Sequence, residues 1–210
     1  NTPTLPGIRE VAQPELKLAG LRINPRTYSQ SRFSFGEDLW LLDIATRKEI
    51  RLTGLPQNLR LADMAWSPDQ SSLAFTHIAD ASGFSWLPDS RSLLVRLRPA
   101  GQGAVPVAAT VPAGPNSQDA IPSGSPRQVV TLQDLLKNEN DAAVFDHYTL
   151  VQAAHIELNG KTTMIGTPDR FLAISVAPDG KHVLTQAIER PYSYAVSSRS
   201  FPRRIEVRNL

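Results

Sequence analysis

The sequence predicts an all-β fold built from antiparallel hairpins, because one turn recurs and proline outnumbers glycine. Three segments share a pattern of strand, Pro-Asp turn and second strand, and their turns lie at residues 68–69, 88–89 and 178–179. Proline presets the backbone for the first central position of a turn, and aspartate accepts hydrogen bonds from the turn amides. The 17 prolines and 12 glycines also favour short strands and fixed turns over long helices.

A second type of hairpin accompanies the first. Residues 38–44 and 49–53 form one example, and similar segments occur at 155–165 and 204–210. When the two types alternate, each unit has four antiparallel strands, which is the blade of a β-propeller. Both alternating sets of side chains in residues 38–44 are largely apolar, as expected for a sheet packed between two neighbouring blades. We therefore expect part of a β-propeller with several four-stranded antiparallel blades.

The units do not add up to a complete ring. Pro68 and Pro88 are only twenty residues apart, whereas a full blade takes about 40–45 residues. One outer hairpin is expected to be missing between Gly83 and Phe84, either because that blade is truncated or because the sequence omits a segment of the native gene. The last strand also lacks a partner. Three or four partial blades in residues 1–210 predict a propeller fragment.

One long insertion interrupts the strands. Residues 99–130 are rich in Pro, Ala, Gly and Ser, which predicts an extended excursion. Residues 131–148 are expected to form a helical insertion on the rim of the ring. Its first helix would be capped by Thr131, broken at residues 138–140 and followed by a second turn capped by Asp141. The apolar side chains of that second turn are Val144, Phe145 and Tyr148.

Composition excludes several classes of protein. Hydrophobic residues make up 41% and charged residues 20%, which argues against a disordered tail, and no run of about 18 apolar residues could span a bilayer. The 22 basic and 20 acidic residues leave a net charge of +2, too balanced for a nucleic-acid partner. The absence of cysteine excludes disulfides, thiolate zinc sites and a cysteine nucleophile, and is compatible with any compartment.

Four segments together resemble one family. They are residues 14–25, residues 84–90, residues 132–138, and residues 190–194 with 201–207. The amino-acid sequences of these segments are similar to segments in the propellers of prolyl-oligopeptidase-family serine peptidases, specifically the glutamyl-peptidase-like branch of bacteria and chloroplasts. The resemblance implies a propeller that covers an α/β-hydrolase domain of the same protein and restricts entry to short or unfolded peptide substrates. Bacterial members of this family have export signals. The resemblance therefore makes a periplasmic location of this protein plausible.

The catalytic residues of that family are not expected in this chain. An α/β-hydrolase carries its nucleophile in a Gly-x-Ser-x-Gly turn between a strand and a helix. Ser85 follows Gly83 at the right spacing, but the second glycine is absent and the segment begins a strand. We therefore exclude Ser85 as a nucleophile and expect the catalytic domain beyond Leu210. The alternative is a stand-alone propeller that binds partner proteins and catalyses nothing.

The carboxyl-terminal segment supplies the candidate substrate-binding residues. Between residues 190 and 208 five arginines accompany one acidic residue. A glutamyl-specific enzyme must hold an anionic side chain, and arginine offers planar paired donors for a carboxylate. In the alternative that we favour, these arginines pair with carboxylates of neighbouring blades or stack on Tyr192 and Tyr194. The candidates are Arg190, Arg199, Arg203 and Arg204.

No metal or cofactor site is expected. Histidines 77, 147, 155 and 182 form neither a His-x3-His nor a His-Glu-x-x-His pair, so structural or surface roles are expected for them. The glycines at 101 and 103 lack the third glycine and the preceding strand of a phosphate-binding loop.

Two further groups of residues are expected to be structural. The acidic group is expected to form a solvated helix face, and it consists of Asp134, Glu139, Asp141 and Asp146. The tryptophans are expected to pack between blades rather than to form a ligand platform, and they are Trp40, Trp66 and Trp86.

Overall fold

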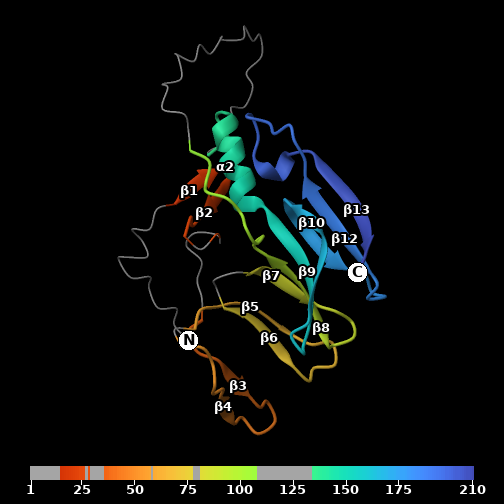
Figure 1. The fold of residues 1–210 in the computed structure, drawn as a ribbon. Coiled ribbons are helices and arrows are strands. Elements are labelled where there is room, and N and C mark those ends of the chain that lie inside the picture. Colours follow the sequence, from red (N-terminus) through yellow and green to blue (C-terminus); the bar gives the residue numbers. More distant parts are fainter. Residues whose placement is uncertain (1–14, 27, 29–35, 58, 78–80, 108–133) are drawn as a thin grey trace, which may run out of the picture.

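The computed structural model describes residues 15–26, 28, 36–57, 59–77, 81–107 and 134–210 (Figure 1). These residues form antiparallel sheets, one α-helix and one short 3-10 helix, η1 (Ser198–Ser200). The prediction of an all-β protein with antiparallel pairing is confirmed. The sheets do not close into a ring within the described ranges.

One sheet has the four antiparallel strands predicted for a complete unit. Its strands are β7 (Ala81–Trp86), β8 (Ser92–Leu97), β9 (Val151–Glu157) and β10 (Thr162–Asp169), in the order β10-β9-β8-β7. The Pro-Asp hairpin supplies β7 and β8, and the second hairpin type supplies β9 and β10. The long insertion therefore leaves and re-enters this sheet between β8 and β9.

The other sheets have fewer strands. The three-stranded sheet consists of β11 (Phe171–Val176), β12 (His182–Ile188) and β13 (Arg203–Asn209). The two-stranded sheets pair β1 (Leu16–Leu18) with β2 (Leu21–Ile23), β3 (Trp40–Leu42) with β4 (Glu49–Arg51), and β5 (Leu61–Trp66) with β6 (Leu73–His77).

The hairpin predicted to be missing between Gly83 and Phe84 is not located there, because both residues lie within β7, whose pairing with β8 shifts register between Ala81 and Phe84. The sheet of β5 and β6 has two strands, and residues 78–80, which separate β6 from β7, lie outside the described residues.

The three Pro-Asp turns share one hydrogen-bonding scheme. Asp69 Oδ1 accepts from the amide two residues later at 3.0 Å, and the equivalent bonds at Asp89 and Asp179 are both 2.9 Å. The Ser67 hydroxyl also donates to Asp69 at 2.6 Å and, with the Ser71 amide, lowers the pKa of Asp69 to about 2. Local side-chain chemistry thus fixes each reversal.

The residue after each turn aspartate has a left-handed backbone. The φ angles are 61° at Gln70, 57° at Ser90 and 66° at Gly180. A side chain makes this conformation unfavourable by about 1–2 kcal/mol, whereas glycine adopts it freely. The first two turns therefore carry local backbone strain that the third avoids.

One cluster of buried apolar side chains joins the four-stranded sheet to the three-stranded sheet. Leu94 and Ala153 of the four-stranded sheet contact Val183 and Ala187 of the three-stranded sheet within one cluster of buried side chains. Val183 is fully buried, and burying such a side chain stabilises the fold by about 1.5–3 kcal/mol. This contact fixes the two sheets as consecutive layers.

The opposite face of the three-stranded sheet is apolar and exposed. Leu184 of β12 pairs with Val207 of β13, and Ile205 lies two residues from Val207 on the same face. These side chains are 39%, 69% and 63% exposed, whereas the alternating residues Val183 and Thr185 are buried. The sheet therefore presents an exposed apolar patch to solvent, next to the polar residues Ser175 and Gln186, which pair with Leu184 and Ile205.

The helical insertion begins elsewhere than predicted. Helix α2 (Glu139–Thr149) starts where a break was expected, because Asn138 is its N-cap and accepts from the Asp141 amide at 2.9 Å. Residues 134–137 are not helical, and the expected cap Thr131 lies outside the described residues. Residues 99–107 contain no helix or strand, and the rest of the predicted excursion, residues 108–130, lies outside the described ranges.

The helix belongs to a cluster of buried apolar side chains. Phe145 is fully buried and contacts the rings of Tyr192 and Phe201 at centroid distances of 5.2 and 5.8 Å. Leu18 and Ala19, at the β1–β2 hairpin, belong to the same cluster. Figure 1 shows α2 beside this hairpin. The insertion thus joins the amino-terminal hairpin to the segment between β12 and β13.

Exchanging glycine between equivalent turn positions tests whether the left-handed conformation strains a residue that has a side chain. Gln70→Gly should raise the free energy of unfolding by about 0.5–1 kcal/mol, and Gly180→Gln should lower it by about 1 kcal/mol or more. A Cβ at residue 180 would lie in ordinary contact with Pro88 Cδ, at 3.4 Å, so the loss comes from the backbone conformation. Urea denaturation of both variants measures the two changes. Shifts of the same sign would contradict the account.

Candidate functional site

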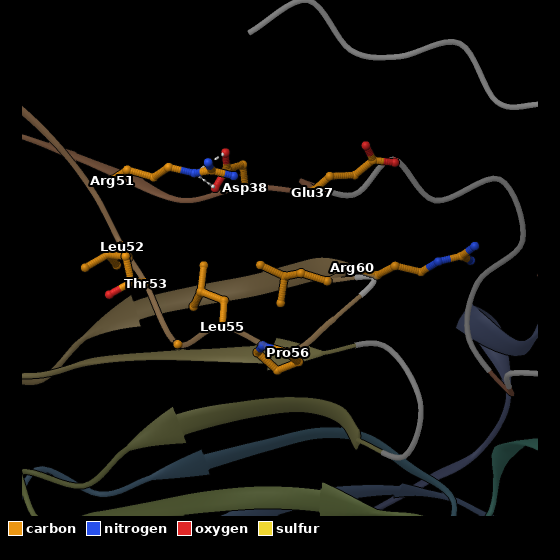
Figure 2. A pocket seen from close by; sticks show the side chains of 10 residues that line it. Glu37, Asp38, Arg51, Leu52, Thr53, Leu55, Pro56 and Arg60 are labelled. Carbon is orange, nitrogen blue, oxygen red and sulfur yellow. Dashed lines mark hydrogen bonds and ion pairs between the residues drawn. The ribbon is translucent and has the colours of Figure 1, made fainter.

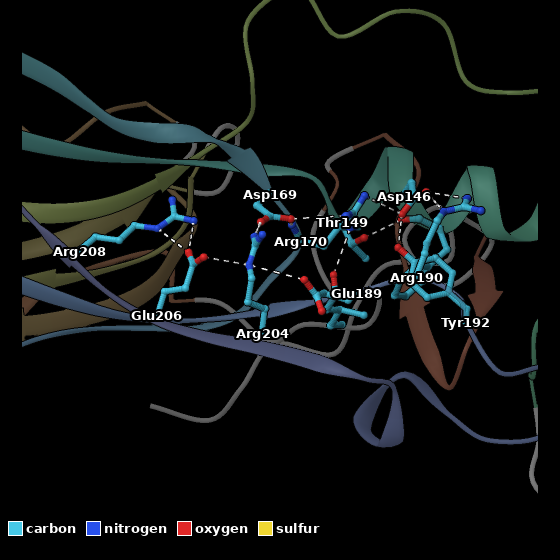
Figure 3. A network of polar contacts seen from close by, with 12 residues as sticks. Asp146, Thr149, Asp169, Arg170, Glu189, Arg190, Tyr192, Arg204, Glu206 and Arg208 are labelled. Carbon is cyan, nitrogen blue, oxygen red and sulfur yellow. Dashed lines mark hydrogen bonds and ion pairs between the residues drawn. The ribbon is translucent and has the colours of Figure 1, made fainter.

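Asp146 of helix α2 is the centre of a charged network that reaches the carboxyl-terminal sheet (Figure 3). Its Oδ2 accepts from Arg190 Nη2 at 2.7 Å and from Nε at 2.9 Å. Its Oδ1 accepts from Arg170 Nη1 at 3.3 Å and from the Tyr192 hydroxyl. The Asp146 side chain is only 24% exposed. The prediction of a solvated helix face is therefore wrong for Asp146, whereas Glu139, with a side chain 78% exposed, fits it.

Arg190 is held on several sides. Besides its bonds to Asp146, its Nη1 donates to Glu139 at 3.1 Å, and its guanidinium lies 5.0 Å from the centroid of the Tyr192 ring. The hydrogen bonds to Asp146 raise the pKa of Arg190 above its usual value, and burial followed by the Asp146 hydrogen bond raises the pKa of Tyr192. Arg190 thus pairs with carboxylates and stacks on Tyr192, which is the alternative to substrate binding that was favoured from the sequence.

The network continues along the sheet to its edge strand. Asp169 contacts both Arg170, at 3.5 Å, and Arg204. Arg204 Nε in turn lies 3.2 Å from Glu206, which also pairs with Arg208. Figure 3 shows this alternation of positive and negative side chains from α2 to β13. Arg204, like Arg190, is thus engaged by carboxylates.

Arg199 and Arg203 lie outside this network. Arg199 is exposed in η1, and its backbone carbonyl accepts a hydrogen bond from the exposed Arg203 side chain. Within the described ranges neither side chain forms an ion pair with a carboxylate. The four predicted arginines therefore divide into two that brace the fold and two that face solvent.

Another polar cluster joins residues far apart in sequence. The Tyr28 hydroxyl lies 3.0 Å from His147 Nε2 and accepts from Arg98 Nη2 at 2.8 Å. The Arg98 guanidinium covers the Tyr28 ring at 3.7 Å from its centroid. Burial, followed by the charge of Arg98, lowers the pKa of His147. Sequence reasoning missed this cluster, because 119 residues separate Tyr28 from His147.

Two other histidines also have partners. His77 Nδ1 accepts from the Arg60 amide at 3.1 Å, and His182 Nδ1 lies 2.7 Å from Asp179. Across the described part of the chain, no group of three or more acidic, histidine or cysteine side chains could hold a metal ion. No helix found there is long and apolar enough to cross a membrane.

The three tryptophans differ in their packing. Trp86 Nε1 donates to the Ala65 carbonyl at 2.9 Å, which links β7 to β5 as expected for packing between sheets. Trp40 and Trp66 are 48% and 52% exposed. The predicted inter-sheet packing is therefore seen for Trp86, and the other two present much of their surface to solvent.

An open groove of about 630 Å³ lies between the β3–β4 hairpin and β5 (Figure 2). Arg51 Nε and Asp38 Oδ2 form an ion pair at 3.1 Å on one wall, and Leu55 and Pro56 lie on the other. Glu37 and Arg60 also line it, so the groove carries both signs of charge. This arrangement has no nucleophile activated by a base and defines no reaction.

The described fold is an all-β arrangement of antiparallel sheets with a helical insertion. Two curated proteins that are similar in sequence to this chain are both named as peptidases. The chain is 31% identical to the "Probable glutamyl endopeptidase, chloroplastic" of Arabidopsis thaliana, over 97% of this chain and 25% of that protein. It is 32% identical to the protein of the same name from Oryza sativa subsp. japonica, over 97% and 26% respectively. No family model and no solved structure matches. The chain spans about a quarter of these relatives and is related to that region of them.

The matched stretch also contains residues that this chain lacks. It is 241 residues long in the first comparison, which exceeds the 210 residues here, so at least 31 positions have no counterpart.

Removing the carboxylate of Asp146 tests the network. Asp146→Asn should lower the free energy of unfolding by about 1–3 kcal/mol, because it leaves Arg190, Arg170 and Tyr192 without their shared charged acceptor. Urea denaturation measures the change. Glu49→Gln on the exposed strand β4 is the matched control and should change stability by less than about 0.5 kcal/mol. Equal effects of the two variants would refute a central role for Asp146.

Proposed function

We propose that this chain is part of the β-propeller of a prolyl-oligopeptidase-family serine peptidase, and that it selects substrates without itself catalysing hydrolysis. The four-stranded meander of β7 to β10 supports a blade. The relatives' name supports proteolysis, and their greater length leaves room for a catalytic domain elsewhere in such a protein. Ser85 lies on strand β7 and not on a turn into a helix, in keeping with a non-catalytic role.

The observation that carries the proposal is the uncovered face of the three-stranded sheet. In a propeller each blade packs between two neighbours, so a blade at the end of an arc leaves one apolar face exposed. Leu184, Ile205 and Val207 form such a face, while the other side of the same sheet packs on the four-stranded sheet. The two faces of one sheet thus support an arc of stacked blades.

The proposed mechanism is exclusion by geometry. A ring over the mouth of an active site admits short or extended peptides and blocks folded proteins. Hydrolysis would follow the acyl-transfer route of a serine, its histidine base and an oxyanion hole, all supplied by an α/β-hydrolase domain outside this chain. The chain itself would need no cofactor for this role.

The arginines would add selection by charge. Arg199 and Arg203 are exposed and unpaired with carboxylates among the described residues, so they are the substrate-facing candidates. Arg190 and Arg204 would act indirectly by holding the surrounding segment in place.

Fluorophosphonate labelling of the full-length protein that contains this chain tests the peptidase assignment. We expect one labelled serine in that protein and none in residues 1–210 alone. The same protein should cleave a short peptide and leave the identical sequence intact when it is embedded in a folded domain. A full-length protein without a reactive serine would favour the alternative, a stand-alone propeller that binds partner proteins through the face of Leu184, Ile205 and Val207.

Substitution of the exposed arginines tests charge selection. Arg199→Ala or Arg203→Ala should lower kcat/KM for cleavage after glutamate about tenfold, with a smaller loss for cleavage after alanine, because a charged hydrogen bond is lost. Arg47→Ala, in the exposed turn between β3 and β4, is the control. Equal losses for both peptides would reject charge selection.

A further inference from the structure

A small cavity lies where the edge strands of two consecutive sheets approach each other. Its volume is about 250 Å³, and it is lined by residues of β7, β8 and β11. Arg96 is the one charged residue among the described residues that line it. Leu94, Leu172 and Ile174 supply apolar walls, and Ser85 supplies a hydroxyl. Arg96 is therefore the charged group that a ligand in the cavity would meet, and the carboxylate of Asp63 lies near its guanidinium.

Gly83 makes room for the Arg96 guanidinium. A Cβ atom built on Gly83 would lie 2.6 Å from Arg96 Nη2, closer than real Cβ contacts come. Gly83 also has a φ of +111°, which residues with side chains rarely adopt. The backbone at residue 83 therefore favours glycine, and a side chain there would displace the end of the Arg96 side chain.

Arg96 has donors to spare for a ligand. Asp63 of β5 lies on the other side of the same space, with Oδ2 3.6 Å from the built Cβ position of Gly83. Burial lowers the pKa of Arg96, and the attraction of Asp63 offsets part of that change. Within the described ranges no hydrogen bond or ion pair joins the guanidinium to a carboxylate at contact distance. A guanidinium has five N–H donors, of which one carboxylate uses at most two in a paired contact.

The size of the cavity limits its occupant. Pockets that enclose small-molecule ligands usually measure about 300–1,000 Å³, so a cavity of this volume suits one side chain or chain end. A partly desolvated guanidinium is best satisfied by a planar anion that accepts two parallel hydrogen bonds, which is the geometry of a carboxylate.

We propose that this cavity binds a peptide carboxylate, with Arg96 as the paired donor, Ser85 as a second donor, and Leu94 and Ile174 against the adjoining methylene groups. The carboxylate is that of an acidic side chain or of a peptide carboxyl terminus. That the ligand is a peptide rests on the proposed function, whereas the preference for a carboxylate rests on the cavity alone. This site is separate from the exposed Arg199 and Arg203.

Isothermal titration of the 210-residue chain with three blocked peptides tests the proposal. N-acetyl-Ala-Glu-Ala-amide carries only a side-chain carboxylate, N-acetyl-Ala-Ala-Ala carries only a terminal one, and N-acetyl-Ala-Gln-Ala-amide carries neither. We expect binding of the first or the second and at least about tenfold weaker binding of the third. The stronger of the first two identifies the source of the carboxylate. Equal affinity for all three peptides, or binding of none, would overturn the proposal.

Variants locate the binding on the cavity. Arg96→Gln should weaken binding of the preferred peptide about tenfold, and Gly83→Ala should weaken it by displacing the guanidinium. Ser85→Ala should leave the strand intact and cause a smaller loss of peptide binding. It is the test variant if thermal unfolding shows that the other two variants are not folded. Arg91→Gln, exposed in the neighbouring turn, removes the same charge and should leave binding unchanged. Equal losses at Arg91 and Arg96 would exclude the cavity.

Failure of this proposal is distinguishable from failure of the proposed function. Absence of peptide binding with a reactive serine in the full-length protein would reject the cavity and leave the peptidase assignment intact. Carboxylate binding by the chain without any reactive serine would retain the cavity and reject the assignment.

Discussion

The structure depends on one packing contact, the burial of one face of the three-stranded sheet against the four-stranded sheet. Val183 and Ala187 are removed from water there by Leu94 and Ala153, and apolar burial of this kind is the main favourable contribution to folding. Because side chains alternate across a strand, the same register directs Val207 and its neighbours away from the core. The stacking direction of the sheets and the exposed apolar face are therefore two consequences of one register.

The helical insertion adds a second type of contact to this stack. It leaves the four-stranded sheet after β8, packs Phe145 against the amino-terminal hairpin and the segment after β12, and returns as β9. Asp146 then ties the helix to Arg170 and Arg190, which both lie at the open end of the β11–β12 hairpin. Packing thus places the insertion, and the charged network fixes its angle to the sheet. In a propeller this would hold the solvent-facing arginines on a braced segment.

The hairpins could be predicted from the sequence because their turns are specified locally, by an aspartate that bonds to an amide two residues away. The start of α2 was missed because Asn138 was taken as a helix breaker, although asparagine serves equally as an N-cap. The pairing of Arg190 with Asp146 has no local signal, since 44 residues separate the two. The role of Gly83 was also hidden, because only the fold brings Arg96 over its Cα atom. Turns can be predicted from the sequence because neighbouring residues specify them, whereas contacts between sheets join residues that are far apart in the sequence.

The central claim is that the apolar face of the three-stranded sheet is covered by another sheet in the full-length protein. Because the chain has no cysteine, a single thiol reports on this face without interference from other thiols of the chain. The direct measurement is the rate of maleimide labelling of Val207→Cys, compared between residues 1–210 and the full-length protein, with Lys48→Cys on the exposed β3–β4 turn as the reference. The account predicts rapid labelling in the isolated chain and at least about tenfold slower labelling in the full-length protein, with an unchanged reference rate. Equally rapid labelling of Val207→Cys in both would contradict it.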